Sequence, residues 1–232
     1  MAQRIAIIAL TCDRIDEAFQ TWHHNLKDTP YLVYWWDNSQ VQANRDKLTE
    51  MAAHFGDRII HVSEGKAENI GIAKALNNLM RVAFSFGHEV CVTMADDLVE
   101  AHDYPRLLTE ALDMVPNAGI AASPPSEGSL RYERQSTNGI RWETGDVIGN
   151  WAIPKTTFDT IGSLPEYYGI YGPIDLDYCA RVRKAGLLPI YRSDITSRHL
   201  GVSTPQTHAY EKQVSLNDAW PIYSQKMREL EA

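Results

Sequence analysis

The feature that most constrains the fold is the alternation of short apolar runs with amphipathic helical segments through the first half of the chain. Ile5–Leu10 is continuously apolar, as a strand buried on both faces would be. Further on, apolar residues recur at i, i+3, i+4, i+7, i+8 and i+11, which is one face of a helix. They are Ile72, Ala75, Leu76, Leu79, Met80 and Ala83, and Gly87 ends this helix. This alternation of strands and helices predicts an α/β fold with a mainly parallel sheet flanked by helices.

The other predicted elements follow from the same kinds of pattern. Further strands are expected at Tyr31–Trp36, Ile59–Val62, Val90–Met94, Val147–Ile153 and Leu188–Arg192. Further helices are expected at Ile15–Leu26, Gln42–Phe55, Tyr104–Met114 and Ile174–Ala185. Ser123–Gly139 is rich in Ser, Pro, Gly and Glu, and it is expected to be a loop or lid.

Length and composition favour a single globular domain. The chain has 232 residues, of which 44% are hydrophobic and 22% charged, and it shows no internal repeat or linker. A formal net charge of -8 argues against avid non-specific binding of nucleic acid. The three cysteines show no CxxC spacing, which favours a reducing compartment. No apolar run reaches the roughly 18 residues of a membrane helix, so we expect a soluble, cytoplasmic protein.

Polar residues follow three of the predicted strands, at the edge where open parallel sheets bind ligands. These residues are Thr11, Asp13 and Arg14 after the first strand, Asp37, Asn38 and Ser39 after the second, and Asp96 and Asp97 after the fourth. The first two groups also suit ordinary turns, since Asp, Asn and Ser favour turns anyway. Both interpretations of those two groups stay open at this point.

The adjacent carboxylates Asp96 and Asp97 point more strongly to a ligand. Two neighbouring negative charges at a strand end repel each other, and a divalent cation offsets that repulsion directly. Mg²⁺ or Mn²⁺ held by one or two carboxylates and by substrate phosphates is a common arrangement. The alternative is a solvated acidic turn that caps the helix at Tyr104–Met114.

A second acidic pair, Asp175 and Asp177, lies at the start of a predicted helix. Residues two apart do not share a helix face, and Arg181 lies four residues after Asp177. We therefore expect Asp177 to pair with Arg181 and Asp175 to face a substrate. Alternatively, both acids stabilise the helix N-terminus by interacting with the helix dipole. His199 follows the last strand. A lone histidine is more often structural, so it is a candidate metal ligand only together with Asp96, Asp97 and Asp175.

The order of these motifs resembles glycosyltransferase family 2, which has the GT-A fold. The resemblance covers roughly residues 4 to 202. The matching stretches are Thr11-Cys12-Asp13-Arg14, Trp36-Asp37-Asn38-Ser39, Asn69-Ile70-Gly71-Ile72-Ala73, Met94-Ala95-Asp96-Asp97, Gly149-Asn150, and Tyr171-Gly172-Pro173-Ile174-Asp175-Leu176-Asp177 with Arg181, Gly186 and His199. The Ile-Gly-Ile-Ala version looks like the rhamnosyltransferase branch. Two residues depart from the pattern, because Ala95 and Ile174 stand where the family carries acids.

The resemblance implies an inverting, metal-dependent transfer of a sugar from a nucleotide-sugar, UDP- or dTDP-linked, to an acceptor hydroxyl. Asp175 would be the general base, and Asp97 with His199 would hold Mn²⁺ or Mg²⁺. Thr11, Arg14, Asp37, Asn69 and Asp96 would bind the nucleotide-sugar, with Asp37 accepting from N3–H of uracil or thymine. Trp151 would bind the acceptor, since an indole face suits a sugar or base ring.

Within a single GT-A domain spanning 1–232, the resemblance makes 1–100 the nucleotide-binding half and 101–205 the acceptor and catalytic half, followed by a helical tail at 206–232. The acceptor could be a saccharide, a small molecule, a protein or a modified DNA base, and the oligomeric state is open. A catalytically silent module that binds nucleotide-sugars or glycans is the main alternative. A sugar nucleotidyltransferase is less compatible, because no Gly-rich phosphate loop follows the first strand.

Overall fold

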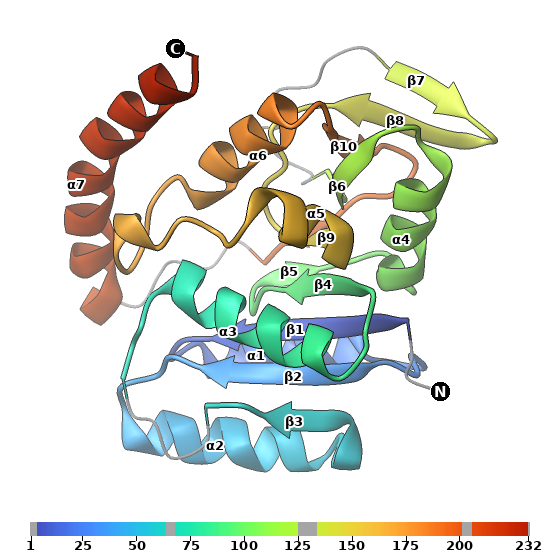
Figure 1. Ribbon diagram of the computed structural model, residues 1–232. Coiled ribbons are helices and arrows are strands. Elements are labelled where there is room, and N and C mark those ends of the chain that lie inside the picture. The colour runs from blue at the N-terminus through green and yellow to red at the C-terminus, as the bar shows by residue number, and fades with distance from the viewer. Residues whose placement is uncertain (1–3, 64–67, 125–133, 201–205, 232) are drawn as a thin grey trace.

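The computed structural model describes residues 4–63, 68–124, 134–200 and 206–231, and within these ranges a nine-stranded sheet carries helices on both faces (Figure 1). The elements of the first half are β1 (Ile5–Thr11), α1 (Ile15–Asn25), β2 (Leu32–Asp37), α2 (Gln42–Ala53), β3 (Ile59–His61), α3 (Ile72–Ser85) and β4 (Val90–Met94). Strands β3, β2, β1 and β4 lie side by side and run parallel. This part of the fold confirms the predicted strand–helix alternation.

The second half completes the sheet and adds a long terminal helix. Its elements are β5 (Leu98–Val99), α4 (Tyr104–Met114), β6 (Ala118–Ala122), β7 (Arg134–Thr137), β8 (Ile140–Thr144), β9 (Trp151–Pro154), α5 (Lys155–Ile161), α6 (Ile174–Lys184), β10 (Leu188–Arg192), β11 (Arg198–His199) and α7 (Gln206–Glu231). The strand order is β3-β2-β1-β4-β9-β6-β10-β8-β7. Strands β9 and β8 run opposite to their neighbours, so the predicted mainly parallel α/β sheet is confirmed.

The sequence patterns located this second half less well. The predicted loop at 123–139 contains β7 near its end, whereas residues 125–133 lie outside the described ranges. The strand predicted at Val147–Ile153 begins only at Trp151. Strand β6, with the sequence AGIAA, was not predicted because small residues carry little β-propensity. Its burial between β9 and β10 stabilises it instead.

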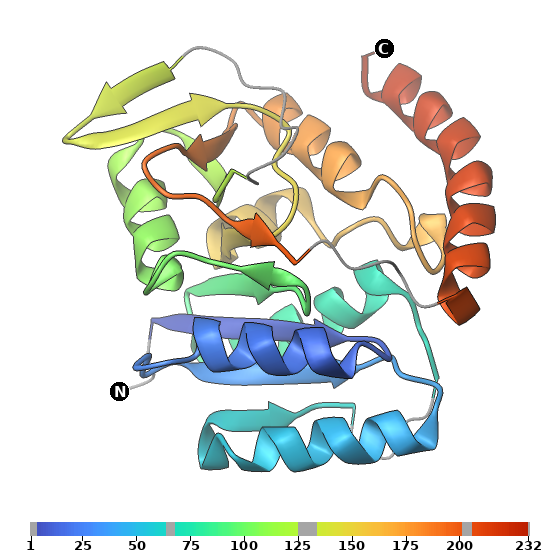
Figure 2. The same cartoon turned by 180° about the vertical axis from the view of Figure 1, so that it is seen from behind.

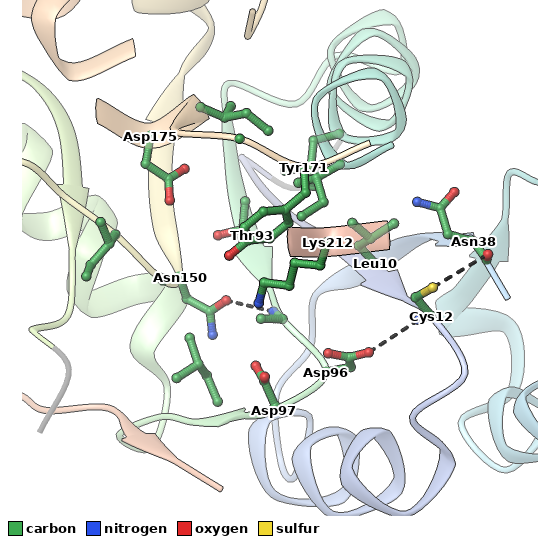
Figure 3. Close-up of a pocket in the computed structure, with 18 of the residues that line it drawn as sticks. Leu10, Cys12, Asn38, Thr93, Asp96, Asp97, Asn150, Tyr171, Asp175 and Lys212 are labelled. Atoms are coloured by element: carbon green, nitrogen blue, oxygen red, sulfur yellow. Dashed lines mark hydrogen bonds between the residues drawn. The ribbon is translucent and has the colours of Figure 1, made fainter. Parts of the chain in front are cut away.

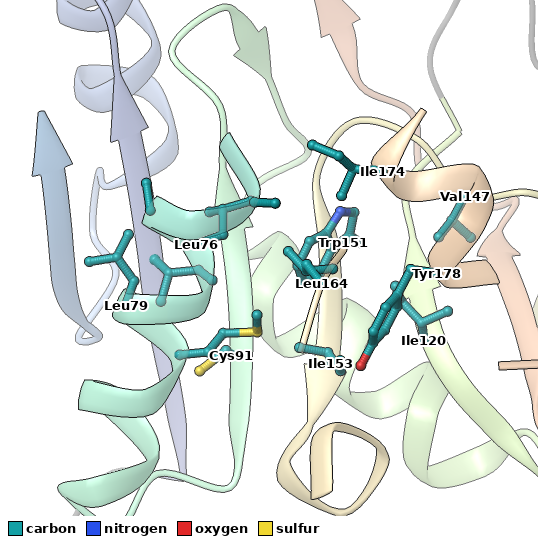
Figure 4. Packing of buried hydrophobic residues seen from close by; sticks show 14 of the residues in the cluster. Leu76, Leu79, Cys91, Ile120, Val147, Trp151, Ile153, Leu164, Ile174 and Tyr178 are labelled. Carbon is teal, nitrogen blue, oxygen red and sulfur yellow. The ribbon is translucent and has the colours of Figure 1, made fainter. Parts of the chain in front are cut away.

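Alternate residues of the central strands pack on opposite faces of the sheet. On β1, Ala6 and Ile8 join the large cluster beneath α3 and α6, whereas Ile7 and Ala9 join the cluster beneath α1 and α2. Figure 4 shows the first cluster, where residues of α3 and α6 meet Trp151 and Ile153 of β9. Figure 2 shows α1 on the opposite face. This two-sided burial explains why the central strands read as continuous apolar runs.

The start of α3 is fixed against the segment that precedes α6. The backbone N–H of Ile72 donates to the carbonyl of Ile170 at 3.1 Å. Gly71 has a φ of +85°, and a Cβ there would lie 2.6 Å from the Gly169 carbonyl oxygen. Glycine is therefore required by both the backbone conformation and the close approach. The contact joins the first half of the fold to the loop that leads to Asp175.

The predicted tail helix is α7, the longest helix of the described chain. It packs beside α6, with Lys184 Nζ donating to the carbonyl of Leu230 at 2.7 Å. The Ser215 hydroxyl accepts from the backbone N–H of Tyr171 at 3.0 Å and donates to its carbonyl at 2.5 Å. Across the described residues, no helix combines the length and the apolar character that crossing a bilayer requires.

Candidate active site

A cavity of about 820 Å³ opens at the carboxyl ends of β1 and β4 (Figure 3). This is the edge at which open α/β sheets bind ligands, and the volume suits a ligand of nucleotide-sugar size. Eight of the nine predicted site residues line it, namely Thr11, Arg14, Asn69, Asp96, Asp97, Trp151, Asp175 and His199. The fold therefore brings together residues that span most of the sequence.

Asp97 is the most heavily engaged carboxylate of this cavity. Its Oδ2 pairs with the guanidinium of Arg14 and lies 3.2 Å from Nε2 of His199. The same guanidinium lies 3.5 Å from Oδ1 of Asp96. One cation thus neutralises part of the charge of the adjacent acids, which is the offset that their repulsion requires.

A small antiparallel ladder explains why His199 reaches Asp97. Strand β11 pairs with β5, and His199 stands opposite Leu98 in the register. The backbone N–H of Leu200 then donates to the carbonyl of Asp97 at 2.9 Å. Neither two-residue strand could be recognised from its sequence, because side-chain alternation needs a longer run. The predicted proximity of His199 to the acidic pair is nevertheless confirmed.

A buried polar network holds the loop that carries the acidic pair. Asn150 accepts from the backbone N–H of Ala95 at 2.7 Å and donates to the carboxylate of Glu100 at 2.9 Å. Asn25 accepts from the backbone N–H of Glu100 at 2.9 Å, and the Ser123 hydroxyl donates to the Glu100 carboxylate. Burial raises the pKa of Glu100 to about 7, although the two donated hydrogen bonds oppose that rise. These hydrogen bonds hold the loop in place at the point where it meets the cavity.

Asp96 faces the cavity from a nearly dehydrated position. Burial raises its pKa to about 7, the Arg14 guanidinium lowers it, and the neighbouring Asp97 raises it. Its Oδ2 accepts from the backbone N–H of Cys12 at 3.3 Å, and its carbonyl accepts from Thr21 at 3.1 Å. Such a shifted group in a cavity is typical of a functional site.

Asp175 enters the cavity from the first turn of α6, across from the acidic loop (Figure 3). Burial raises its pKa to about 7, and a hydrogen bond from Trp151 opposes this rise. A carboxylate with a pKa near neutrality is well matched to accepting a proton at physiological pH. Trp151 itself is only 2% exposed and lines the cavity, and its indole N–H is the group that donates to Asp175.

Asp177 points away from the cavity, as predicted, and Arg181 is its partner. The Arg181 Nε lies 2.6 Å from Asp177 Oδ1, while Tyr168 donates to Oδ2 at 2.7 Å and Tyr167 donates to the same oxygen. The Asp177 side chain is fully buried. The pair is therefore expected to matter for stability, since breaking a buried ion pair typically costs about 3–5 kcal/mol.

Asp37 is the predicted site residue that does not line the cavity. It is 1% exposed, and its Oδ1 accepts from Thr11 at 3.1 Å and from the backbone N–H of Ser39 at 2.9 Å. Its Oδ2 makes no hydrogen bond within the described ranges and lies 4.0 Å from Arg45 Nε. Thr11, which donates to Asp37, lines the cavity, whereas Asp37 itself does not.

Several residues of the cavity were given no role in the site by the sequence analysis. Asn150 supports the acidic loop, Tyr171 precedes α6, and Lys212, Leu216 and Trp220 come from α7. The last three stand at i, i+4 and i+8, which is one face of a helix. That spacing is the signal that could have placed the tail helix against the site.

The donors at the cavity decide whether the implied divalent metal fits. In the described ranges, no group of three or more His, Cys, Asp or Glu side chains is positioned to hold a metal ion. Asp97 and His199 nevertheless place a carboxylate oxygen and an imidazole nitrogen 3.2 Å apart at the cavity. Two converging donors fit a cation whose remaining positions are completed by substrate phosphates and water.

Comparisons with known proteins identify the fold. No family model and no curated protein matches the sequence. The structure of GalNAc-T7 with UDP, GalNAc and Mn²⁺ is similar with a TM-score of 0.63 at 12% identity, over 87% of this chain and 45% of that one. The mannosyltransferase PcManGT from Pyrobaculum calidifontis, in complex with GDP-Man and Mn²⁺, gives 0.62 at 17% identity, over 89% of this chain and 59% of that one.

The chain thus spans between two fifths and three fifths of the length of these two glycosyltransferases. At such identities the likeness concerns the fold, and it confirms the predicted α/β architecture of the GT-A type.

Proposed function

We propose that the protein is an inverting glycosyltransferase that moves a sugar from a nucleoside diphosphate sugar to an acceptor hydroxyl. The observation that carries the proposal is the placement of Asp175, which faces the Asp97–His199 pair across one cavity. Residues 1–100 form its nucleotide-binding half and residues 101–205 its acceptor half. The fold neighbours that hold nucleotides or a nucleotide-sugar together with Mn²⁺ add support.

In the proposed reaction, the carboxylate of Asp175 accepts the proton of the acceptor hydroxyl. The hydroxyl oxygen forms a bond to the anomeric carbon as the bond from that carbon to the diphosphate oxygen breaks, and the electron pair leaves with the diphosphate. Trp151 orients the carboxylate through its indole N–H. Arg14 keeps Asp96 and Asp97 in place beneath the donor. A divalent metal held by Asp97 and His199 would supply stabilisation of the charge on the leaving diphosphate.

The hydrogen bond from Trp151 gives a first prediction. Trp151→Phe removes a donor that favours the ionised form of Asp175, so the pKa of that carboxyl rises and the acid limb of the pH–kcat profile moves to higher pH. At pH 7 we expect kcat to fall by roughly tenfold, the scale of a hydrogen bond to a charged group. Phe84→Leu, a buried aromatic change remote from the cavity, serves as the control. A profile unchanged in midpoint contradicts the assigned contact.

We further propose that the donor carries uracil or thymine, and that Asp37 reaches the base when the side chain of Thr11, which lines the cavity, moves aside. A carboxylate accepts from the N3–H of these bases, whereas cytosine lacks that hydrogen. Titration calorimetry should show UDP or dTDP binding about tenfold more tightly than CDP, which is the scale of one hydrogen bond to a charged group. Asp37→Asn should reduce this preference. Equal affinities for UDP and CDP would show that Asp37 does not recognise the base. The comparison is needed because a protein of similar fold holds GDP-Man, so the fold alone does not determine the base.

A panel of nucleotide-sugars tests the proposed activity. The protein is incubated with UDP-, dTDP- and GDP-linked sugars, Mn²⁺ and mixed acceptors, and mass spectrometry scores both released nucleotide and glycosylated product. Saccharides, small molecules, peptides and DNA with modified bases represent the possible acceptors. Binding without turnover would instead identify a silent nucleotide-sugar module, which Ala95 in place of the family acid mildly favours. Release of pyrophosphate from a nucleoside triphosphate and a sugar phosphate would identify a nucleotidyltransferase.

A further inference from the structure

The cavity receives a cation from an element that lies outside the region of family resemblance. Lys212, Leu216 and Trp220 line it from one face of α7. Trp220 is 46% exposed, whereas Lys212 is half-buried and points into the cavity (Figure 3). The helix therefore directs its charged residue into the cavity.

The Lys212 ammonium is held by an aromatic ring. It lies over the ring of Tyr171, 4.3 Å from the ring centre, and it pairs with no carboxylate among the side chains that the structure describes. The Tyr171 backbone is clamped to the same helix through the two hydrogen bonds with Ser215. The ring and the lysine are thus presented together by α7.

The charges around the cavity favour an anionic ligand for this lysine. Three carboxylates line the cavity, and one of its cations, Arg14, is already engaged with Asp96 and Asp97. A diphosphate entering beside these acids therefore needs a further cation. Lysine binds phosphate as a compact, mobile point charge. A hydrogen bond from an ammonium to phosphate is also stronger than an exposed cation–π contact, so leaving the Tyr171 ring for a diphosphate is favourable.

We propose that Lys212 binds the diphosphate of the donor, and that α7 is part of the donor site. This inference rests on the proposed glycosyltransferase function and adds a residue to it. The lysine leaves the Tyr171 ring and pairs with the diphosphate oxygens. Because the ammonium is attached to the tail helix, donor binding also links α7 to the bound diphosphate.

Calorimetry with UDP and uridine at constant Mg²⁺ tests the assignment. Lys212→Met keeps most of the length of the side chain and removes its charge, so it should weaken UDP binding by about tenfold and leave uridine binding unchanged. Lys212→Arg should retain most of the UDP affinity. Lys226→Met is the matched control, because Lys226 lies further along the same helix, pairs with Glu229 and does not line the cavity.

The outcomes separate this assignment from the proposed function. Unchanged or increased UDP affinity in Lys212→Met overturns the assignment, since the ammonium would then be neutral toward the ligand or an obstacle to it. An equal loss of UDP and uridine affinity also overturns it, because such a loss reports damage to the nucleoside site. Failure of the wild-type protein to bind UDP, dTDP or GDP would instead overturn the glycosyltransferase function itself, and this assignment with it.

Discussion

Replacement of Asp175 by asparagine is expected to lower kcat by on the order of 10²–10⁴ while leaving the affinity for the nucleotide nearly unchanged. The substitution preserves the size of the side chain and removes its ability to accept a proton. Asp175 lies at the start of α6 and lines the cavity opposite the acidic loop. It can therefore be lost as a base without disturbing the residues that hold the donor. Single-turnover kinetics and calorimetry with UDP measure the two effects separately.

The pH dependence of the wild-type enzyme should carry the signature of the same carboxyl group. Burial raises the pKa of Asp175 to about 7, and only the ionised form accepts a proton. Turnover should therefore be maintained above pH 7 and fall as the pH drops through that value. In Asp175→Asn the residual turnover should no longer fall as the pH drops through 7.

Asp177→Asn is the matched control, because it makes the same chemical change two residues along the same helix. Its carboxylate is buried with Arg181, Tyr167 and Tyr168 and does not line the cavity. We expect a loss of about 3 kcal/mol in the free energy of unfolding, with kcat retained at temperatures where the variant is folded. Near-normal turnover in Asp175→Asn, or a defect that comes only from lost donor binding, would place the base elsewhere.

The first half of the fold was predictable because its signals are local. Strand β1 is buried on both faces and α3 buries one face, so each pattern repeats over enough residues to be recognised. The polar residues at the strand ends then follow from the general placement of ligands in parallel sheets. Thr11, Arg14 and Asp96 were located in this way, and they do meet in one cavity.

The parts that were not predicted depend on contacts distant in sequence. The β5–β11 ladder has two residues in each strand. It forms only when the fold brings two loops together at the cavity, so neither strand has a local signal. Trp151 was predicted to bind the acceptor, and the sequence could not show that its indole N–H also donates to Asp175. Asp37 was predicted at the site, yet it bonds Thr11 and does not line the cavity. For both residues the type was noticed in the sequence, and tertiary packing decided what the side chain contacts.

Chelation of divalent metal is expected to abolish turnover, and addition of Mn²⁺ or Mg²⁺ should restore it. The reason is the charge that develops on the diphosphate as the bond to the sugar breaks, which a cation beside Asp97 would stabilise. The Arg14 guanidinium already pairs with Asp97, yet it is also shared with Asp96. It is therefore committed to offsetting the repulsion of the two acids, and a metal would add charge stabilisation to that of the proposed Lys212 contact.

The protein offers only two converging donors among its described residues, the Asp97 carboxylate and the His199 imidazole. Mn²⁺ should therefore bind weakly alone and more tightly with UDP, whose phosphates complete the coordination. Electron paramagnetic resonance of free Mn²⁺ measures this without relying on turnover. Asp97→Asn and His199→Ala should each weaken the UDP-dependent binding by at least about tenfold, whereas His102→Ala, which does not line the cavity, should not. Full activity in EDTA, with UDP-dependent Mn²⁺ binding absent, would show that Arg14 and Lys212 supply the positive charge instead of a metal.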